Sequence, residues 1–132
     1  MKKGGILNPA VNKLIAETGH TDYIVVTDAG LPLPENVRTR IDLALKEGTP
    51  GFLETLDTIL TELTVEKIIL AEEIKTVSPQ MNEEILRRFP GIPVEYVPHA
   101  EFKQTTKQAR GFIRSGEFTP YANVILVAGV AY

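Results

Sequence analysis

The chain has 132 residues, of which 43% are hydrophobic, and a formal net charge of −3 at pH 7. This length suits one domain with a substantial core, and we expect residues 1–132 to form it. The slight negative charge and the absence of a lysine/arginine run argue against nucleic-acid binding, and the longest apolar run, residues 124–131, is too short to span a bilayer. The absence of cysteine excludes disulfides and thiolate chemistry and is compatible with a reducing cytosol.

Cap, turn and periodicity signals predict alternating helices and strands. Asn8-Pro9 predicts the start of a helix, because Asn accepts hydrogen bonds from first-turn amides and Pro fits the first helical position; Gly19 predicts its end. Residues 23–27 are β-branched and nearly continuously apolar, which is typical of a strand buried on both faces. The Leu-Pro-Leu-Pro run at 31–34 predicts an extended loop that leaves this strand.

The rest of the chain continues the alternation. We predict a short helix at 40–46, an amphipathic helix at 52–63, a buried strand at 67–71, a helix at 78–89, a strand at 94–97, a basic helix at 102–114 and a last strand at 123–127. Such an order predicts an α/β fold with three α/β/α layers, in which helices cover both faces of a mostly parallel sheet. The pattern leaves room for one antiparallel strand at an edge.

Polar residues at the junctions between these elements are candidates for chemistry. His20 lies between a helix-ending glycine and a strand, and its imidazole suits proton transfer near neutral pH; capping the preceding helix is the alternative role. Asp28 ends the first strand, where ligands bind in α/β sheets. It can serve a site directly, hold an imidazole in one tautomer, or form a turn with Gly30.

A second set of polar candidates lies later in the chain. His99 follows a strand, and Lys103 lies four residues further on, near the same helix end. Tyr121 and Asn123 share one side if their segment is extended, and their hydroxyl and amide groups suit sugar hydroxyls, although core packing also explains Tyr121. Glu72-Glu73 could ligate a cation, but we interpret it as an exposed acidic pair after a strand. The two histidines are not spaced as in a zinc-binding motif, which argues against a zinc site. The sequence has no glycine-rich phosphate-binding loop, which argues against nucleotide binding.

Taken together, these segments resemble the D-ribose pyranase family, sugar mutarotases related to the fucose mutarotases. The resemblance covers nearly the whole chain, through MKKGGILN, GHTDYIVVTDAGLPLP, RIDLAL, LAEE, EYVPH with EFK after it, and TPYANVILVAG. It implies a ribose-pyranase-like fold and a cytoplasmic isomerase that interconverts the β-pyranose and β-furanose forms of D-ribose. The ring would open and reclose by acid/base chemistry, without cofactor or metal.

The resemblance also implies roles for the candidate residues. His20 would be the proton donor, Asp28 would be both a catalytic and a sugar-binding residue, and the other residues of the sugar site would be His99, Lys103, Tyr121 and Asn123. It implies a homo-oligomer, commonly a decamer of two pentamers, with sites completed by a neighbouring subunit. The apolar, uncharged tail at 127–132 is expected to be buried in the sheet or against a partner. The alternative function is a non-catalytic sugar-binding or regulatory subunit associated with ribose uptake.

Overall fold

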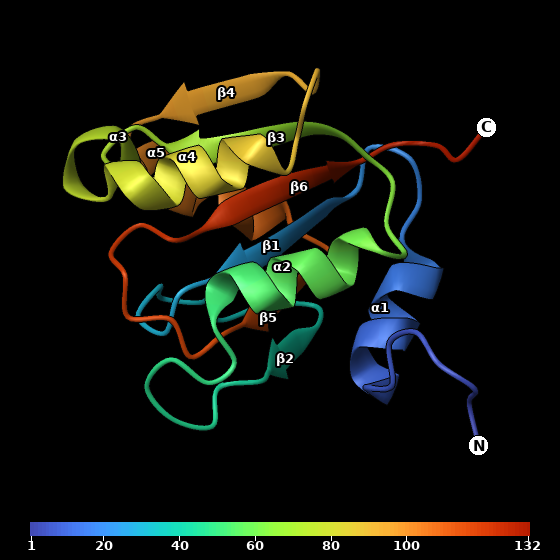
Figure 1. The fold of residues 1–132 in the computed structure, drawn as a ribbon. Helices are drawn as coiled ribbons and strands as arrows, with labels where there is room; N and C mark the ends of the chain where they lie inside the picture. The colour runs from blue at the N-terminus through green and yellow to red at the C-terminus, as the bar shows by residue number, and fades with distance from the viewer.

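The computed structural model describes residues 1–132 and has a six-stranded sheet with helices on both faces (Figure 1). The strands are β1 Tyr23–Thr27, β2 Arg40–Asp42, β3 Val65–Ala71, β4 Val94–Val97, β5 Gly111–Arg114 and β6 Val124–Ala128. The helices are α1 Pro9–Glu17, α2 Phe52–Leu60, α3 Ile74–Val77, α4 Pro79–Arg87 and α5 His99–Thr105, followed by a 3₁₀ turn at Thr106–Gln108. The predicted α/β architecture is confirmed. None of the helices has the length and apolar character needed to cross a membrane.

Five strands run in one direction, and β6 alone runs in the other. The strand order is β2-β5-β1-β6-β3-β4, in which the pairs β2–β5, β1–β5 and β3–β4 are parallel. β6 pairs antiparallel with both β1 and β3, so the antiparallel strand is central and not at an edge. The start of β6 therefore lies at the same edge of the sheet as the carboxyl ends of the other five strands.

Two hydrophobic cores lie on opposite faces of the sheet, and successive side chains of β6 enter them in turn. Val124 and Leu126 enter the core beneath α1, α2 and α4, which lie in front of the sheet in Figure 1. Ile125 and Val127 enter the other core, which contains Phe102 of α5. Because side chains of a strand alternate between faces, such a run is apolar throughout when both faces are covered.

Two predicted helix starts are confirmed. Oδ1 of Asn8 accepts a hydrogen bond from the backbone N–H of Val11 at 3.0 Å, and Pro occupies the first position of α1. Ser78 precedes α4, but its hydroxyl donates to the carbonyl of Pro120 at 2.7 Å and does not cap the helix. This bond ties the start of α4 to the segment that leads into β6.

The prediction of a helix at 40–46 is wrong, because this segment begins with the edge strand β2. Its apolar residues Ile41, Leu43 and Leu45 alternate with their neighbours, which is the period of a strand. Ile41 is buried, whereas Leu45 is 80% exposed. The helix-forming residue types in this segment concealed the alternation.

The helix predicted at 102–114 is also shorter than expected. α5 and the 3₁₀ turn end at Gln108, and the chain then forms β5 between β1 and β2. Phe112 and Ile113 enter opposite cores, as a central strand requires. Gly111 lies so close to α1 that a Cβ there would be 2.7 Å from Cδ1 of Leu14. A glycine at this position therefore reflects close packing of α1 on the strand.

The apolar C-terminal tail is buried only in part. Val127 and Ala128 belong to β6 and are buried, whereas Ala131 and Tyr132 are exposed. Burial in the sheet therefore extends to Ala128, and burial of the last residues against a partner stays a prediction.

Candidate active site

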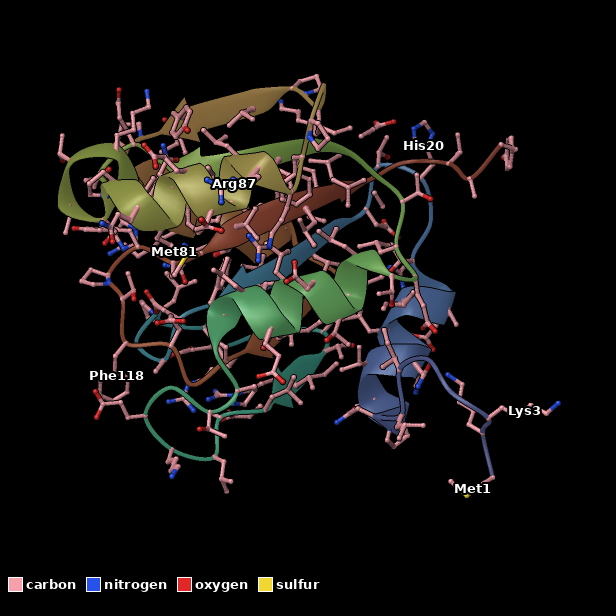
Figure 2. The ribbon with its side chains drawn as sticks, viewed as in Figure 1. Met1, Lys3, His20, Met81, Arg87 and Phe118 are labelled. Carbon is pink, nitrogen blue, oxygen red and sulfur yellow. The ribbon has the colours of Figure 1, made fainter.

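A pocket of about 620 Å³ opens at the edge of the sheet where β1 and β5 end and β6 begins. Its lining includes four of the predicted site residues, Asp28, His99, Tyr121 and Asn123. The remaining lining residues are Ala29, Gly30, Leu31, Pro32, Arg114, Glu117, Phe118 and Pro120. The volume suits a small ligand. Phe118 marks this edge at the lower left of Figure 2.

Asp28 and Asn123 bind each other inside the pocket. Nδ2 of Asn123 donates to Oδ2 of Asp28 at 3.0 Å, and the backbone N–H of Asp28 donates to Oδ1 of Asn123 at 2.9 Å. Oδ1 of Asp28 also accepts hydrogen bonds from the backbone N–H groups of Gly30 and Leu31, at 2.9 and 2.8 Å. Asp28 therefore forms the turn with Gly30 that was one of its alternative roles, and it also lines the pocket. Asn123 is only 1% exposed, so in this structure it chiefly fixes the Asp28 carboxylate.

His99 is held between aromatic rings at the start of α5. Its ring centroid lies 5.0 Å from that of Tyr121 in an edge-on arrangement and 6.3 Å from that of Phe102 in a stacked one. The backbone N–H of His99 donates to both carboxylate oxygens of Glu73 at 3.0 Å. Glu73 is thus more than the exposed acidic residue that we expected, because it anchors the backbone of a pocket residue.

The imidazole of His99 is kept neutral by its surroundings. Burial lowers its pKa below the ordinary 6.5, and the positive charge of Lys103 lowers it further, while Glu73 and Asp28 oppose the shift. Its Nδ1 atom is buried without a hydrogen-bond partner. A neutral imidazole in this position offers one donor and one acceptor to a bound molecule.

Tyr121 adopts an unusual backbone conformation. Its φ is +62°, in the left-handed region that costs a non-glycine residue about 1–2 kcal/mol. Its carbonyl accepts a hydrogen bond from the backbone N–H of Asn123 at 2.8 Å. The segment is thus a tight turn, so the extended chain on which the expected shared side depended is not formed, yet the turn brings both residues into one pocket. Strained residues cluster at functional sites, and this one lies in the pocket.

Lys103 and His20 do not line the pocket. Lys103 lies on α5 and influences the pocket through its charge. His20 precedes β1, whereas Asp28 follows it, so the two are separated by the five residues of this strand, or roughly 17 Å. Figure 2 shows His20 at the end of the molecule opposite Phe118. His20 does not cap α1; its Nε2 lies 2.8 Å from Oε2 of Glu66.

Arg114 was not predicted as a pocket residue. Its Nε donates to the carbonyl of Ala29 at 3.0 Å, and its Nη1 donates to both carboxylate oxygens of Asp42 at 3.0 Å. It therefore fixes the loop after Asp28 to β2. Because residues 102–114 were predicted to be helical, the carboxyl end of β5 could not be recognised as part of the site.

Glu117 is a second lining residue that sequence analysis missed. Its Oε1 accepts from the backbone N–H of Phe52 at 3.0 Å, and its Oε2 accepts from the hydroxyl of Thr119 at 2.8 Å. Burial raises the pKa of Glu117, but these hydrogen bonds outweigh it and lower the pKa below its ordinary value. The residue fastens the loop before Tyr121 to the start of α2. No local pattern indicates a contact with a residue so distant in the chain.

The pocket combines a carboxylate, a neutral imidazole and a phenol. These groups can bind hydroxyl groups and exchange protons with them. No group of three or more His, Asp and Glu side chains lies close enough together to hold a metal ion.

Comparisons with known proteins agree on one family. The model of the RbsD / FucU transport protein family matches residues 1–131. The D-ribose pyranase of Geobacillus thermodenitrificans is 55% identical over 132 residues, covering 100% of this chain and 99% of that protein. The structure of Bacillus subtilis RbsD complexed with D-ribose has a TM-score of 0.96 at 49% identity and covers 100% of both chains. The fucose mutarotase of Streptococcus pneumoniae in complex with L-fucose has a TM-score of 0.77 at 24% identity, covers 96% of this chain and 95% of its own, and supports the fold alone.

Proposed function

The chain belongs to the RbsD / FucU transport protein family, and we propose that it is an isomerase that interconverts the β-pyranose and β-furanose forms of D-ribose. Full-length relatives named D-ribose pyranase support this activity, as does the similarity to an RbsD structure that contains D-ribose. Within the chain, the observation that carries the proposal is the pocket lined by Asp28, His99 and Tyr121.

Changing the ring size requires an acid and a base. In ring opening, the ring oxygen O5 gains a proton and leaves C1 while the anomeric hydroxyl loses its proton and becomes the carbonyl oxygen. In reclosure, the O4 hydroxyl loses its proton and O4 attacks C1, while the carbonyl oxygen gains a proton. The Asp28 carboxylate, fixed by three N–H donors, is suited to bind a sugar hydroxyl or to accept its proton. The neutral His99 and the Tyr121 ring would orient the sugar. Because ribose changes ring form unaided in water, positioning with one or two proton transfers suffices.

The proton donor of this scheme is His20 from a neighbouring copy of the chain. His20 and Asp28 lie at opposite ends of β1, so His20 does not reach the sugar in its own pocket. His20 is exposed, and Phe118, 62% exposed beside the pocket, offers an apolar surface for contact with a neighbour. The family resemblance supports a homo-oligomer, commonly a decamer of two pentamers, and assigns Lys103 to the shared site.

We also propose a domain organisation, a cellular compartment and a cofactor requirement for the enzyme. Residues 1–132 form one sugar mutarotase domain, since both cores lie on a single sheet. The enzyme works in the cytoplasm on ribose after uptake and needs no cofactor. The absence of cysteine is compatible with this compartment.

Saturation-transfer NMR on equilibrated D-ribose tests the activity directly. Saturation of an anomeric signal of the pyranose should pass to the furanose faster when the protein is present. L-Fucose and D-galactose, run in parallel, report the sugar preference. A non-catalytic sugar-binding subunit would bind ribose but leave the exchange rate at that of the buffer, and this result would refute the proposal.

A further inference from the structure

Glu66 occupies a β-bulge at the start of β3. Val65 pairs with Ala128 of β6, but Lys67 pairs with Val127, so the register shifts at Glu66 and leaves this residue without a partner on β6. A bulge turns one side chain away from the regular alternation of its strand, and bulges are over-represented near active sites.

The bulge is held in place by the end of β6. The backbone N–H of Gly129 donates to the carbonyl of Thr64 at 2.8 Å. A Cβ on Gly129 would lie 3.2 Å from Cβ of Glu66, so the backbone of Gly129 lies directly against the bulge. The position of the Glu66 side chain is thus set by strand pairing on one side and by close packing on the other.

The turn that carries His20 is fixed to the same end of β6. The backbone N–H of Thr21, whose φ is +70°, donates to the carbonyl of Ala128, and the N–H of Ala128 donates to the carbonyl of Asp22, both at 2.9 Å. The Asp22 carboxylate in turn accepts from Nε of Arg110 at 2.6 Å. The turn that carries His20 and the bulge that carries Glu66 are therefore both held by backbone contacts with the end of β6, at Ala128.

Between these segments, Oε2 of Glu66 lies 2.8 Å from Nε2 of His20. We propose that Glu66 is a positioning residue that accepts the Nε2–H of His20, so that Nδ1 is the atom that takes up a proton to form the imidazolium and then donates this proton to the substrate. This inference rests on the proposed role of His20 as proton donor. A carboxylate that accepts one N–H of an imidazole fixes both the tautomer and the direction of the ring.

Asp22, two residues from His20, is already bonded to Arg110. His20 makes no hydrogen bond other than that with Glu66. Of the carboxylates, Glu66 alone contacts a ring nitrogen of His20, so in this proposal it is the group that fixes the tautomer.

Ring ¹⁵N spectra of the assembled protein, labelled on its two histidines, test the inference. We expect the neutral His20 of the wild type to carry its proton on Nε2, with a His20→Ala sample assigning the signals. Glu66→Ala should give a mixture of tautomers. It should lower kcat roughly tenfold and leave KM nearly unchanged, because losing the hydrogen-bond partner that orients a functional histidine typically costs about 10–100-fold in activity. Glu66→Gln keeps an acceptor oxygen and should retain the tautomer and most of kcat.

Glu95→Gln is the matched control, because Glu95 is also a half-exposed, ion-paired carboxylate of the same sheet. It should change neither tautomer nor kcat. A wild-type His20 protonated on Nδ1, or a Glu66→Ala protein with unchanged tautomer and kcat, would overturn the inference. If the wild type fails to accelerate ring exchange, the proposed function is refuted, while the tautomer spectra still decide whether Glu66 fixes the ring.

Discussion

Asn123 and Asp28, 95 positions apart in the sequence, exchange two hydrogen bonds where β6 begins and β1 ends. The amide group of Asn123 donates to the carboxylate, and its carbonyl oxygen accepts the backbone N–H of Asp28. Both polar atoms of the Asn123 side chain are therefore in use. Both oxygens of the Asp28 carboxylate are in use as well, one toward Asn123 and the other toward the backbone N–H groups of Gly30 and Leu31, and this double acceptor role gives a specific test.

Asp28→Asn should destabilise the protein as well as inactivate it. Whichever way the new amide group is turned, its NH2 group faces either the NH2 group of Asn123 or the backbone N–H groups of Gly30 and Leu31, and two N–H donors cannot satisfy each other. We expect the free energy of unfolding to fall by about 1–3 kcal/mol, the usual cost of an unsatisfied buried polar group. Urea denaturation measures the stability, and saturation-transfer NMR measures the ring exchange.

The exchanged pair Asp28→Asn with Asn123→Asp is the control for that prediction. The carboxylate at 123 would accept from the new amide and from the backbone N–H of residue 28, so most of the lost stability should return. Ring exchange should stay low, because the carboxylate has moved. A double variant as unstable as Asp28→Asn alone would contradict the hydrogen-bond pattern described above.

His20→Ala should abolish ring exchange without affecting the fold or the assembly. The side chain is 50% exposed and its contact with Glu66 lies at the surface, so its loss should cost little stability. Exchange is measured by saturation transfer, and the oligomer by native mass spectrometry. Ring exchange near the wild-type rate in this variant would exclude His20 as the proton donor.

Mixing two inactive variants tests whether the site is shared between chains. His20→Ala keeps an intact pocket, and Asn123→Ala keeps an intact His20 turn. When the subunits are allowed to exchange, some sites should receive both intact halves and regain activity. If mass spectrometry confirms mixed oligomers and no activity returns, each site is built within one subunit.

The lowered pKa of His99 predicts that stability falls in mildly acidic solution. Between the folded-state pKa of His99 and 6.5, the unfolded chain binds more protons than the folded one, so the free energy of unfolding rises with pH across this window. Above pH 6.5 the stability contributed by the neutral His99 is complete. Urea denaturation at pH values from 7 down to about 5, above the carboxylate range, should show this loss. In His99→Gln, this part of the pH dependence should disappear.

Lys103→Met separates the two causes of the His99 shift. Removing the positive charge should move the pKa of His99 up toward 6.5 without restoring it fully, because burial, the larger cause, remains. The titration is followed by NMR of the imidazole Cε1–H. Lys107→Met, an exposed lysine in the following 3₁₀ turn, should leave the titration unchanged. An unaffected His99 in Lys103→Met would show that burial alone lowers its pKa.

The sequence was sufficient to predict elements whose signals are local. The Asn8-Pro9 start of α1 and the β-branched run of β1 depend on neighbouring residues, and both are confirmed. β5 was not recognised because Gly111–Arg114 begins only three positions after the 3₁₀ turn and has just two large apolar side chains, Phe112 and Ile113. The central place of β6 could not be predicted, because strand order depends on contacts between distant segments.

The same distinction applies to the candidate site. Asp28, His99, Tyr121 and Asn123 could be selected because they lie at junctions, and the sheet brings them together. Glu117 could not be selected, because its partner Phe52 is 65 positions away. His20 is separated from Asp28 by the length of β1, a strand whose position the sequence itself predicts.

The rigid spacing set by β1 bears on how activity depends on dilution. A strand paired on both sides does not slide, so a single chain cannot close the distance between its His20 and its own pocket. If the proton donor His20 comes from a neighbouring subunit, a dissociated subunit has a sugar pocket but no proton donor beside it. Specific activity would then drop as the protein is diluted below its association range, and the rate would follow a power of total concentration greater than one.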